Sequence, residues 1–353
     1  MDTCLGIIGF GGIGKYHAKN CPRAGVKVVA AADILPERIK EAEEAGLKAY
    51  DSADDLLKDE EVNTVMISVP NHLHKEMCIK AAKAGKHIIT EKPAALTVEE
   101  LDEMEEACKE AGVLFTVHQN RRWDRDMLRV KAAYDNKMLG NVFTMESKLH
   151  SGNGYMHEWH LYKKYGGGMM YDWGVHLIDQ ILFIMPDAKI TSLYADVKGV
   201  LHDEVDDYFK IILRFDNDIT AHIELSTYIL DYQPRWLVAG DKGTMIVNDL
   251  GGSTGSIYRT GKMLERLPAQ ITETAAGPTR QFAPVPPGGI VEEPLPEVET
   301  NVLDFFRNYN DVLNGKDEFK IKISEVRRVL AIMEAAFESS KRGESIKFDD
   351  LYS

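Results

Sequence analysis

Residues 165–180 read YGGGMMYDWGVHLIDQ and set Asp172, His176 and Asp179 within an otherwise apolar run. An α-helix advances by about 100° per residue, so the side chains four and seven positions after Asp172 lie on the same helix face. Two carboxylates and an imidazole on one face can exchange protons with a substrate or bind a metal ion. The spacing by itself predicts that the three side chains converge.

His176 is the group in this run best suited to proton transfer, because an unperturbed imidazole has a pKa of about 6.5. Asp172, one turn earlier, can orient the imidazole or accept a hydrogen bond from a hydroxyl. A catalytic metal is the alternative, because the stretch 157–160, HEWH, lies just upstream. Its H-E-x-H spacing differs from the H-E-x-x-H pattern of zinc sites, so we predict no metal here.

A glycine-rich motif at the N-terminus indicates a bound dinucleotide. The motif has the pattern G-x-G-x-x-G and comprises Gly9, Phe10, Gly11, Gly12, Ile13 and Gly14. Gly9 permits a tight turn, Gly11 lets the backbone approach a pyrophosphate, and Gly14 allows close contact between helix and strand. The start of the following helix supplies amide groups and the positive end of a dipole.

Asp33, 19 residues after Gly14, ends the second expected strand, where a carboxylate accepts hydrogen bonds from an adenosine ribose. Its charge would repel a 2′-phosphate, which favours NAD over NADP as the cofactor. Arg38 could stack on the adenine or weaken that preference, and the alternative is an exposed helical arginine.

These groups need elements to position them, and the first 120 residues alternate short apolar strands with helical patterns. The expected strands are Leu5–Gly9, Val26–Asp33, Val65–Val69, His87–Thr90 and Val113–Val117. Pro36 opens one helix, and residues 97–100, TVEE, form a capping box before another. Such alternation predicts a doubly wound parallel sheet, the α/β architecture called a Rossmann fold.

The pattern changes after about residue 120, so we predict two domains, 1–120 and 121–353, the second of α+β type. A helix from Asp124 precedes long strands near Val142–Leu149, Ile190–Val197, Tyr208–Phe215 and Ile219–Tyr228, with turns at 216–218 and 240–243. This order predicts a large, mostly antiparallel sheet. Residues 250–300 form an excursion of unpredicted course. A final helix with an apolar stripe belongs to the core and can pack back on the first domain.

Composition restricts the partners. The 353 residues include 42 Lys plus Arg and 56 Asp plus Glu, for a net charge of −14, which disfavours nucleic acid and anionic membranes. No apolar run approaches the ~18 residues of a membrane span, and no leader peptide is recognised. The four cysteines form no C-x-x-C pair, which favours a reducing cytoplasm.

Several further motifs occur in a characteristic order: Val69-Pro70-Asn71 with His74, Ala84-Gly85-Lys86-His87 before Glu91-Lys92-Pro93, and Gly168, Asp172, Gly174, His176 and Asp179. With them the chain resembles the Gfo/Idh/MocA oxidoreductases, the family of glucose–fructose oxidoreductase and inositol 2-dehydrogenase. The resemblance implies an N-terminal Rossmann domain for NAD or NADP and a C-terminal domain that carries the substrate and often the oligomer interface. We therefore expect a homo-oligomer, a dimer or tetramer.

The resemblance also implies roles for single residues. Lys92, Asp172 and His176 are expected to be catalytic and to face the substrate hydroxyl beside the nicotinamide. Pro70, Asn71, His74, Glu91 and Lys92 join the glycine loop, Asp33 and Arg38 as expected cofactor contacts. The residue types themselves indicate further substrate contacts, because aromatic rings can stack on the C–H face of a sugar while His and Asp bind hydroxyls. The expected substrate contacts are Arg122, at the junction of the two domains, Tyr155, His157, Trp159, Asp172, His176 and, in a supporting role, Asp179.

The predicted chemistry is transfer of a hydride between a ring hydroxyl of a sugar, cyclitol or glycoside and NAD. The Lys92 ammonium can stabilise the alkoxide, and either Lys92 or His176 can be the base, with His176 favoured. Two alternatives are an NAD-retaining glycosidase that acts by transient oxidation and elimination, and a non-catalytic nucleotide-sensing regulator.

Overall fold

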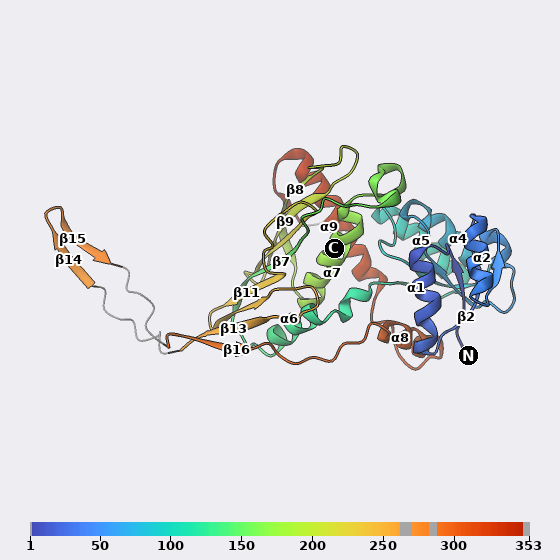
Figure 1. Ribbon diagram of the computed structural model, residues 1–353, viewed down its shortest axis with the longest axis horizontal. Helices are drawn as coiled ribbons and strands as arrows, with labels where there is room; N and C mark the ends of the chain where they lie inside the picture. The colour runs from blue at the N-terminus through green and yellow to red at the C-terminus, as the bar shows by residue number, and fades with distance from the viewer. Residues whose placement is uncertain (1, 262–269, 282–287, 349–353) are drawn as a thin grey trace.

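Two β-sheets organise the protein. The computed structural model describes residues 2–261, 270–281 and 288–348. A six-stranded sheet of parallel strands lies at one end and a nine-stranded, mostly antiparallel sheet occupies the other (Figure 1). A two-stranded hairpin lies apart from both sheets. This is the predicted α/β fold class.

The parallel sheet has the strand order β3-β2-β1-β4-β5-β6 of a Rossmann fold. Its strands are β1 (Cys4–Ile8), β2 (Lys27–Ala32), β3 (Lys48–Tyr50), β4 (Thr64–Ile67), β5 (His87–Thr90) and β6 (Phe115–Val117). The five predicted strands are confirmed to within two residues at each end. The edge strand β3 was missed, because three residues are too few to show a hydrophobic period.

Helices connect these strands: α1 (Gly12–Asn20), α2 (Pro36–Glu44), α3 (Ala53–Leu57), α4 (His74–Lys83) and α5 (Val98–Ala111). Pro36 opens α2 as predicted. The capping box before α5 is half formed, because Thr97 accepts from the Glu100 N–H at 3.1 Å. The Glu100 carboxylate reaches one residue further back and accepts from the Leu96 N–H at 2.9 Å.

The antiparallel sheet has the order β16-β13-β12-β11-β7-β10-β9-β8-β17. Its strands are β7 (Val142–His150), β8 (Ile190–Lys198), β9 (Tyr208–Phe215), β10 (Thr220–Ser226), β11 (Trp236–Gly240), β12 (Gly243–Val247), β13 (Gly255–Thr260), β16 (Ile290–Pro294) and β17 (Ile346–Lys347). β7 and β10 pair in parallel, and the other neighbouring strands of this sheet pair antiparallel. The turns at 216–218 and 240–243 join β9 to β10 and β11 to β12, as predicted.

The remaining helices are α6 (Arg125–Asp135), α7 (Val175–Ile184), α8 (Asp304–Leu313) and α9 (Ile323–Arg342). The predicted apolar stripe of α9 is Val326, Val329, Leu330, Met333 and Phe337, of which the first four are buried and Phe337 is half-buried. The helix also reaches the first sheet's helices, since Glu334 accepts from the Val98 N–H at 2.9 Å. Tyr309 of α8 lies 3.1 Å from the Thr64 hydroxyl of β4. We propose a domain boundary near residue 120, between β6 and α6.

The stretch 250–300 returns to the antiparallel sheet. It contributes β13 and β16 to the edge, and between them lies the hairpin of β14 (Gln270–Thr274) and β15 (Gly277–Gln281). Residues 262–269 and 282–287 of this stretch lie outside the described residues. Among the described helices, none combines the length and the apolar composition needed to cross a bilayer.

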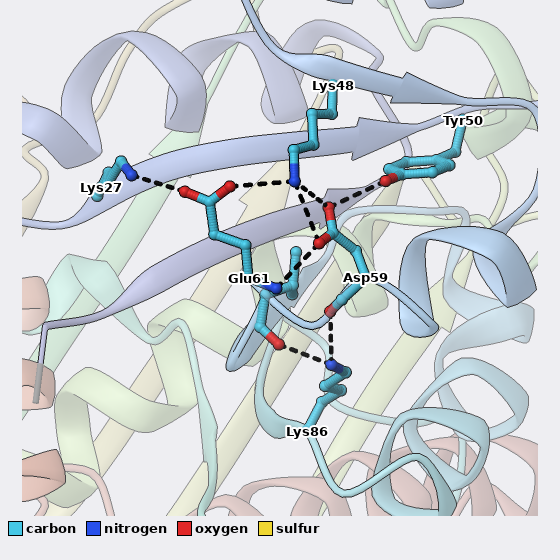
Figure 2. Close-up of polar contacts among 7 residues, drawn as sticks. Lys27, Lys48, Tyr50, Asp59, Glu61 and Lys86 are labelled. Carbon is cyan, nitrogen blue, oxygen red and sulfur yellow. Dashed lines mark hydrogen bonds and ion pairs between the residues drawn. The ribbon is translucent and has the colours of Figure 1, made fainter.

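A charged network closes the amino-terminal edge of the parallel sheet (Figure 2). Lys48 contacts both Asp59 and Glu61 at 3.0 Å, and Lys86 donates to the Asp59 and Val62 carbonyls at 2.8 and 2.7 Å. A shallow hollow of about 960 Å³ opens here, beside Tyr50 and Asp59. Ligands of doubly wound sheets bind at the opposite, carboxyl edge, so we seek the site there.

Candidate active site

The glycine loop leads from β1 into α1 in a conformation that requires glycine at two positions. Gly9 has φ +93°, and a Cβ atom there would lie 2.5 Å from the Ser68 carbonyl oxygen. A Cβ atom on Gly14 would lie 2.2 Å from the Gly9 oxygen. Gly12 and Ile13 are exposed, so the N-terminus of α1 is open to a ligand.

Asp33 follows β2 and is fixed beside this loop. Its carboxylate accepts from the Phe10 N–H at 2.7 Å and from the Leu35 N–H at 3.0 Å. Arg38 donates to the Phe10 carbonyl at 3.4 Å and lies against Gly11. Ile34 is 85% exposed next to Asp33, so an apolar surface adjoins the carboxylate.

The expected cofactor contacts near residue 70 differ in burial and in their hydrogen-bond partners. Pro70 is half-buried at the end of the β4 loop. Asn71 is buried and donates to the Gly166 carbonyl at 2.8 Å. Both ring nitrogens of His74 face carbonyl oxygens, of Pro93 at 2.8 Å and of Val69 at 2.9 Å. Asn71 and His74 thus link neighbouring loops by hydrogen bonds, and we propose for them a positioning role.

Glu91 lies behind Lys92 between two buried histidines. Its Oε1 atom is 2.6 Å from His17 Nε2 and 3.0 Å from His118 Nδ1. Burial opposes ionisation, yet the two histidines hold the pKa of Glu91 well below its usual range. Within the described ranges, His17, Glu91 and His118 are the one group of possible metal ligands whose ligand atoms converge. Glu91 lies at hydrogen-bond distance from both histidines, so hydrogen bonds account for the convergence.

Lys92 follows β5 and reaches the other half of the molecule. Its Nζ atom donates to Asp172 Oδ1 at 2.7 Å and to the Asp172 carbonyl at 2.8 Å. Burial alone would raise the pKa of Asp172, but Lys92 and then His160 lower it below its usual value. The ammonium keeps a third N–H for a substrate oxygen.

Asp172 does not lie in the regular helix that the spacing predicts. Residues Met170–Gly174 form a π-helical turn, and α7 begins at Val175. The wider turn leaves the Asp172 carbonyl available to Lys92. Asp206 anchors the entry to this turn, because its Oδ2 accepts from the Met170 N–H at 2.7 Å.

His176 lies in the first turn of α7 and is 4% exposed. Burial lowers its pKa well below 6.5, and the charges of Lys92 and Arg121 add to the effect. Its Nδ1 atom is buried without a hydrogen-bond partner. The imidazole is therefore neutral at pH 7, and Nε2 is the nitrogen left to exchange a proton.

The expected convergence of Asp172, His176 and Asp179 needs a correction, because Asp179 is paired with Arg122. Arg122 binds Asp179 through two hydrogen bonds of 2.6 and 2.8 Å, and both side chains are 3% exposed. Arg122 also contacts Glu325 of α9 at 2.8 Å. The pair is enclosed between α7 and α9, so we assign it to packing in place of substrate contact.

The neighbouring arginine lies nearer the site. Arg121 stacks over the Trp173 ring at 4.1 Å and is held by Asp124 at 2.8 Å. In the 3₁₀ turn Asn120–Trp123, successive side chains point in different directions, so Arg121 and Arg122 have different surroundings. The sequence motif N-R-R-W carries no signal that separates them.

A row of rings leads from the surface to Asp172. Tyr155 is 66% exposed and stacks on His157 at 5.8 Å, and His157 lies 5.0 Å from His160. Trp159 stacks on His160 at 3.8 Å. His160 Nε2 lies 3.8 Å from Asp172 Oδ1, so His160 belongs to the site, whereas its sequence context indicates no role beyond that of a metal ligand.

Two family models match the chain. The model of the oxidoreductase family with an NAD-binding Rossmann fold matches residues 4–119, and that of the GFO/IDH/MocA C-terminal domain matches residues 127–246. The chain belongs to the Gfo/Idh/MocA oxidoreductase family. It is thus an oxidoreductase, and its cofactor is NAD.

Three relatives illustrate the similarity. An uncharacterized oxidoreductase of Schizosaccharomyces pombe is 32% identical over 327 residues, 84% of each chain. Myo-inositol 2-dehydrogenase of Thermotoga maritima is 29% identical over 273 residues, 72% of this chain and 80% of that one. The crystal structure of an NAD-binding protein from Listeria innocua is 36% identical with a TM-score of 0.90, covering 99% and 100% of the two chains.

The described residues of this Gfo/Idh/MocA protein fit the dinucleotide. The open amides at the start of α1 suit a pyrophosphate, and Gly12 has no side chain to hinder its close approach to the backbone. The exposed Ile34 beside Asp33 suits an adenosine. The residues that would hold it are those of the glycine loop together with Asp33 and Arg38.

Proposed function

We propose that this oxidoreductase acts on a secondary ring hydroxyl of a neutral polyol, a sugar, cyclitol or glycoside. One observation carries the proposal: Lys92, from the end of β5, meets Asp172 on the turn that opens into α7, with His176 one helical turn further on. An ammonium, a carboxylate and a neutral imidazole are thereby assembled at the carboxyl edge of the dinucleotide-binding sheet.

NAD, when bound, supplies the hydride acceptor for oxidation. Lys92 donates its free N–H to the substrate oxygen and stabilises the negative charge that develops there. His176 accepts the hydroxyl proton at Nε2 and returns it in the reverse direction. Asp172 holds the ammonium in place and accepts a hydrogen bond from a further hydroxyl.

His176 is the proposed base because of how the two candidates are bonded. Lys92 Nζ is engaged by Asp172, with which it forms an ion pair and two hydrogen bonds. His176 is neutral and holds an unprotonated nitrogen at pH 7, since burial lowers its pKa. A group that is already unprotonated can accept the hydroxyl proton directly.

The surroundings favour an uncharged substrate with a carbon ring. The aromatic residues Tyr155, Trp159 and Trp173 offer flat faces to C–H groups, while Asp172 and the histidines read hydroxyls. Arg122 is paired with Asp179 and so is not free to bind an anion. The Thermotoga maritima relative is named for a cyclitol, myo-inositol.

The test is a screen of sugars, inositols and glycosides with NAD and with NADP, followed by NADH or NADPH absorbance. We expect one or more polyols to reduce NAD, and His176→Gln to lower kcat/KM by about 10²-fold or more. His222→Gln on β10 is the matched control and keeps full rate. Sugar release without net NADH would identify a glycosidase, and normal turnover in His176→Gln would refute the assigned base.

Location and assembly are also proposals. All four cysteines are free, and the buried thiols of Cys78 and Cys108 share a hydrogen bond of 3.8 Å without a disulfide, which supports a reducing cytoplasm. A homo-oligomer, a dimer or tetramer, is supported by apolar strand residues that keep exposed surface, such as Tyr194, 42% exposed. Sedimentation of the purified protein tests the second point.

A further inference from the structure

His160 places an unused ring nitrogen beside the catalytic carboxylate. It lies in the 3₁₀ turn Glu158–Leu161, where its ring stacks on Trp159 with centroids 3.8 Å apart and an interplanar angle of 20°. Its Nε2 atom lies 3.8 Å from Asp172 Oδ1. The stacking fixes the ring plane, so this nitrogen is held toward Asp172.

The other ring nitrogen defines the tautomer. Nδ1 of His160 lies 3.1 Å from the His157 carbonyl, which can only accept a hydrogen bond. Nδ1 therefore carries the proton in the neutral ring, and Nε2 has a free lone pair. Burial lowers the pKa of His160 against the opposing charge of Asp172, which keeps the ring neutral at pH 7.

His160 Nε2 and Asp172 Oδ1 are thus both acceptors, and Asp172 Oδ1 already has one donor, Lys92 Nζ at 2.7 Å. The separation of 3.8 Å is too long for a hydrogen bond, and across the part of the chain that the structure describes nothing donates to His160 Nε2. Acceptors placed side by side at a substrate site are satisfied by ligand hydroxyls. Hydroxyls on adjacent ring carbons lie close enough for each to reach one of them.

We propose that His160 and Asp172 together select a substrate with two adjacent hydroxyls, one hydrogen-bonded to Asp172 Oδ1 and the other to His160 Nε2. The inference rests on the proposed function and narrows its substrate class to vicinal diols. The pair itself offers no donor to a carboxylate or phosphate, because both atoms accept hydrogen bonds. His160 thereby acts as a specificity-determining residue.

The experiment compares matched ligands and matched variants. The ligands are a cyclitol oxidised by the enzyme, its monodeoxy analogue and its mono-O-methyl analogue, each altered at one neighbouring hydroxyl. His160→Phe keeps a ring against Trp159 and removes the acceptor, whereas His160→Gln keeps an acceptor oxygen. His222→Phe, on the other face of β10 from the buried Ala221 and Ile223, is the control.

The wild-type enzyme should favour the intact cyclitol by about tenfold or more in kcat/KM, because a site built to bind a hydroxyl discriminates against its absence. His160→Phe should lower kcat/KM for the intact cyclitol alone, so that the preference is lost. His160→Gln should restore part of the preference. Equal losses on all three ligands, or no preference in the wild type, would overturn the proposal.

Failure of the proposed function can be distinguished from failure of the role inferred for His160. If no polyol reduces NAD, that function is refuted, and calorimetric binding of myo-inositol and of its monodeoxy and mono-O-methyl analogues to the protein with NADH then tests His160 directly. A preference for the intact cyclitol that His160→Phe abolishes supports the diol site. Equal binding of the three ligands, or no binding, overturns it.

Discussion

Lys92 Nζ lies 2.7 Å from Asp172 Oδ1, although the two residues are 80 positions apart in the chain. The contact joins the end of β5 in the parallel sheet to the π-helical turn Met170–Gly174 of the second half. A cation from the dinucleotide-binding half thus meets an anion from the other half. The proposed site exists only where both halves are folded and packed together.

Lys92→Met removes the group that stabilises the alkoxide, so kcat/KM for polyol oxidation should fall by about 10²- to 10³-fold. NAD binding, measured by fluorescence or calorimetry, should weaken much less. The matched control is Lys109→Met, whose lysine forms an exposed i,i+4 pair with Glu105. Unchanged kcat/KM in Lys92→Met would remove the lysine from the mechanism.

Arg121 should control the pH dependence through His176. The base must be neutral, and burial with the charges of Lys92 and Arg121 lowers its pKa well below 6.5, so the acid limb of kcat/KM lies below 6.5. Arg121→Gln removes one charge, raises the pKa of His176 and moves the limb to higher pH. Arg121→Lys keeps the charge and leaves the limb in place. An identical limb in both variants would contradict this.

Asp33 should set the preference for NAD. Its carboxylate is fixed by the Phe10 and Leu35 amides, where it repels a 2′-phosphate, and Arg38 is close enough to the loop to attract one. Asp33→Ser should raise the NADP-to-NAD ratio of kcat/KM by about tenfold or more. Adding Arg38→Ala should lower the ratio again. Initial rates with each cofactor measure both effects.

Local signals in the sequence predict those parts of the site that depend on neighbours in the chain. The glycine loop and Asp33 follow from short spacings, because a tight turn and a ribose contact impose them. The partners of Asp172 and Asp179 cannot be predicted in this way. Helical periodicity shows which face of a helix a side chain occupies, but not which residues pack against that face. Lys92 was placed at the site through resemblance, and its contact with Asp172 is long-range.

The residues that were misplaced or missed share a physical reason. The π-helical turn at Asp172 has the composition of an ordinary helix, so no spacing rule identifies it. Arg121 and Arg122 are adjacent, yet one lies over Trp173 and the other is buried with Asp179. His160 lies in the four-residue 3₁₀ turn Glu158–Leu161, which is too short to show a period from which the direction of a side chain can be inferred.

Asp179→Asn tests the assignment of the Arg122 pair to packing. The substitution leaves the buried guanidinium with Glu325 as its remaining carboxylate, so the free energy of unfolding should fall by about 3 kcal/mol. KM should stay unchanged at temperatures where the variant is folded. Asp102→Asn, which breaks the more exposed pair with Arg327, should change stability by at most about 1 kcal/mol. A raised KM without loss of stability would restore a substrate role.

Asp206 should make stability depend on pH through the turn that carries Asp172. Burial raises its pKa to about 7 in the folded protein, and the unfolded chain has the usual value of about 3.9. The folded state then binds the extra proton between these values, so this contribution is full at low pH and is lost as the pH rises through about 7.

Asp206→Asn keeps an acceptor for the Met170 N–H but cannot ionise. The stability of Asp206→Asn relative to the wild type should rise by about 3 kcal/mol between pH 5 and pH 8, because the wild type loses stability with rising pH until its folded state ionises at about pH 7. Asp203→Asn, an exposed acid of the same loop, should show no such pH dependence. Thermal unfolding at both pH values measures the difference. A loss of stability in Asp206→Asn that is equal at both pH values would show that the carboxylate acts only as an anchor and not as a titrating group.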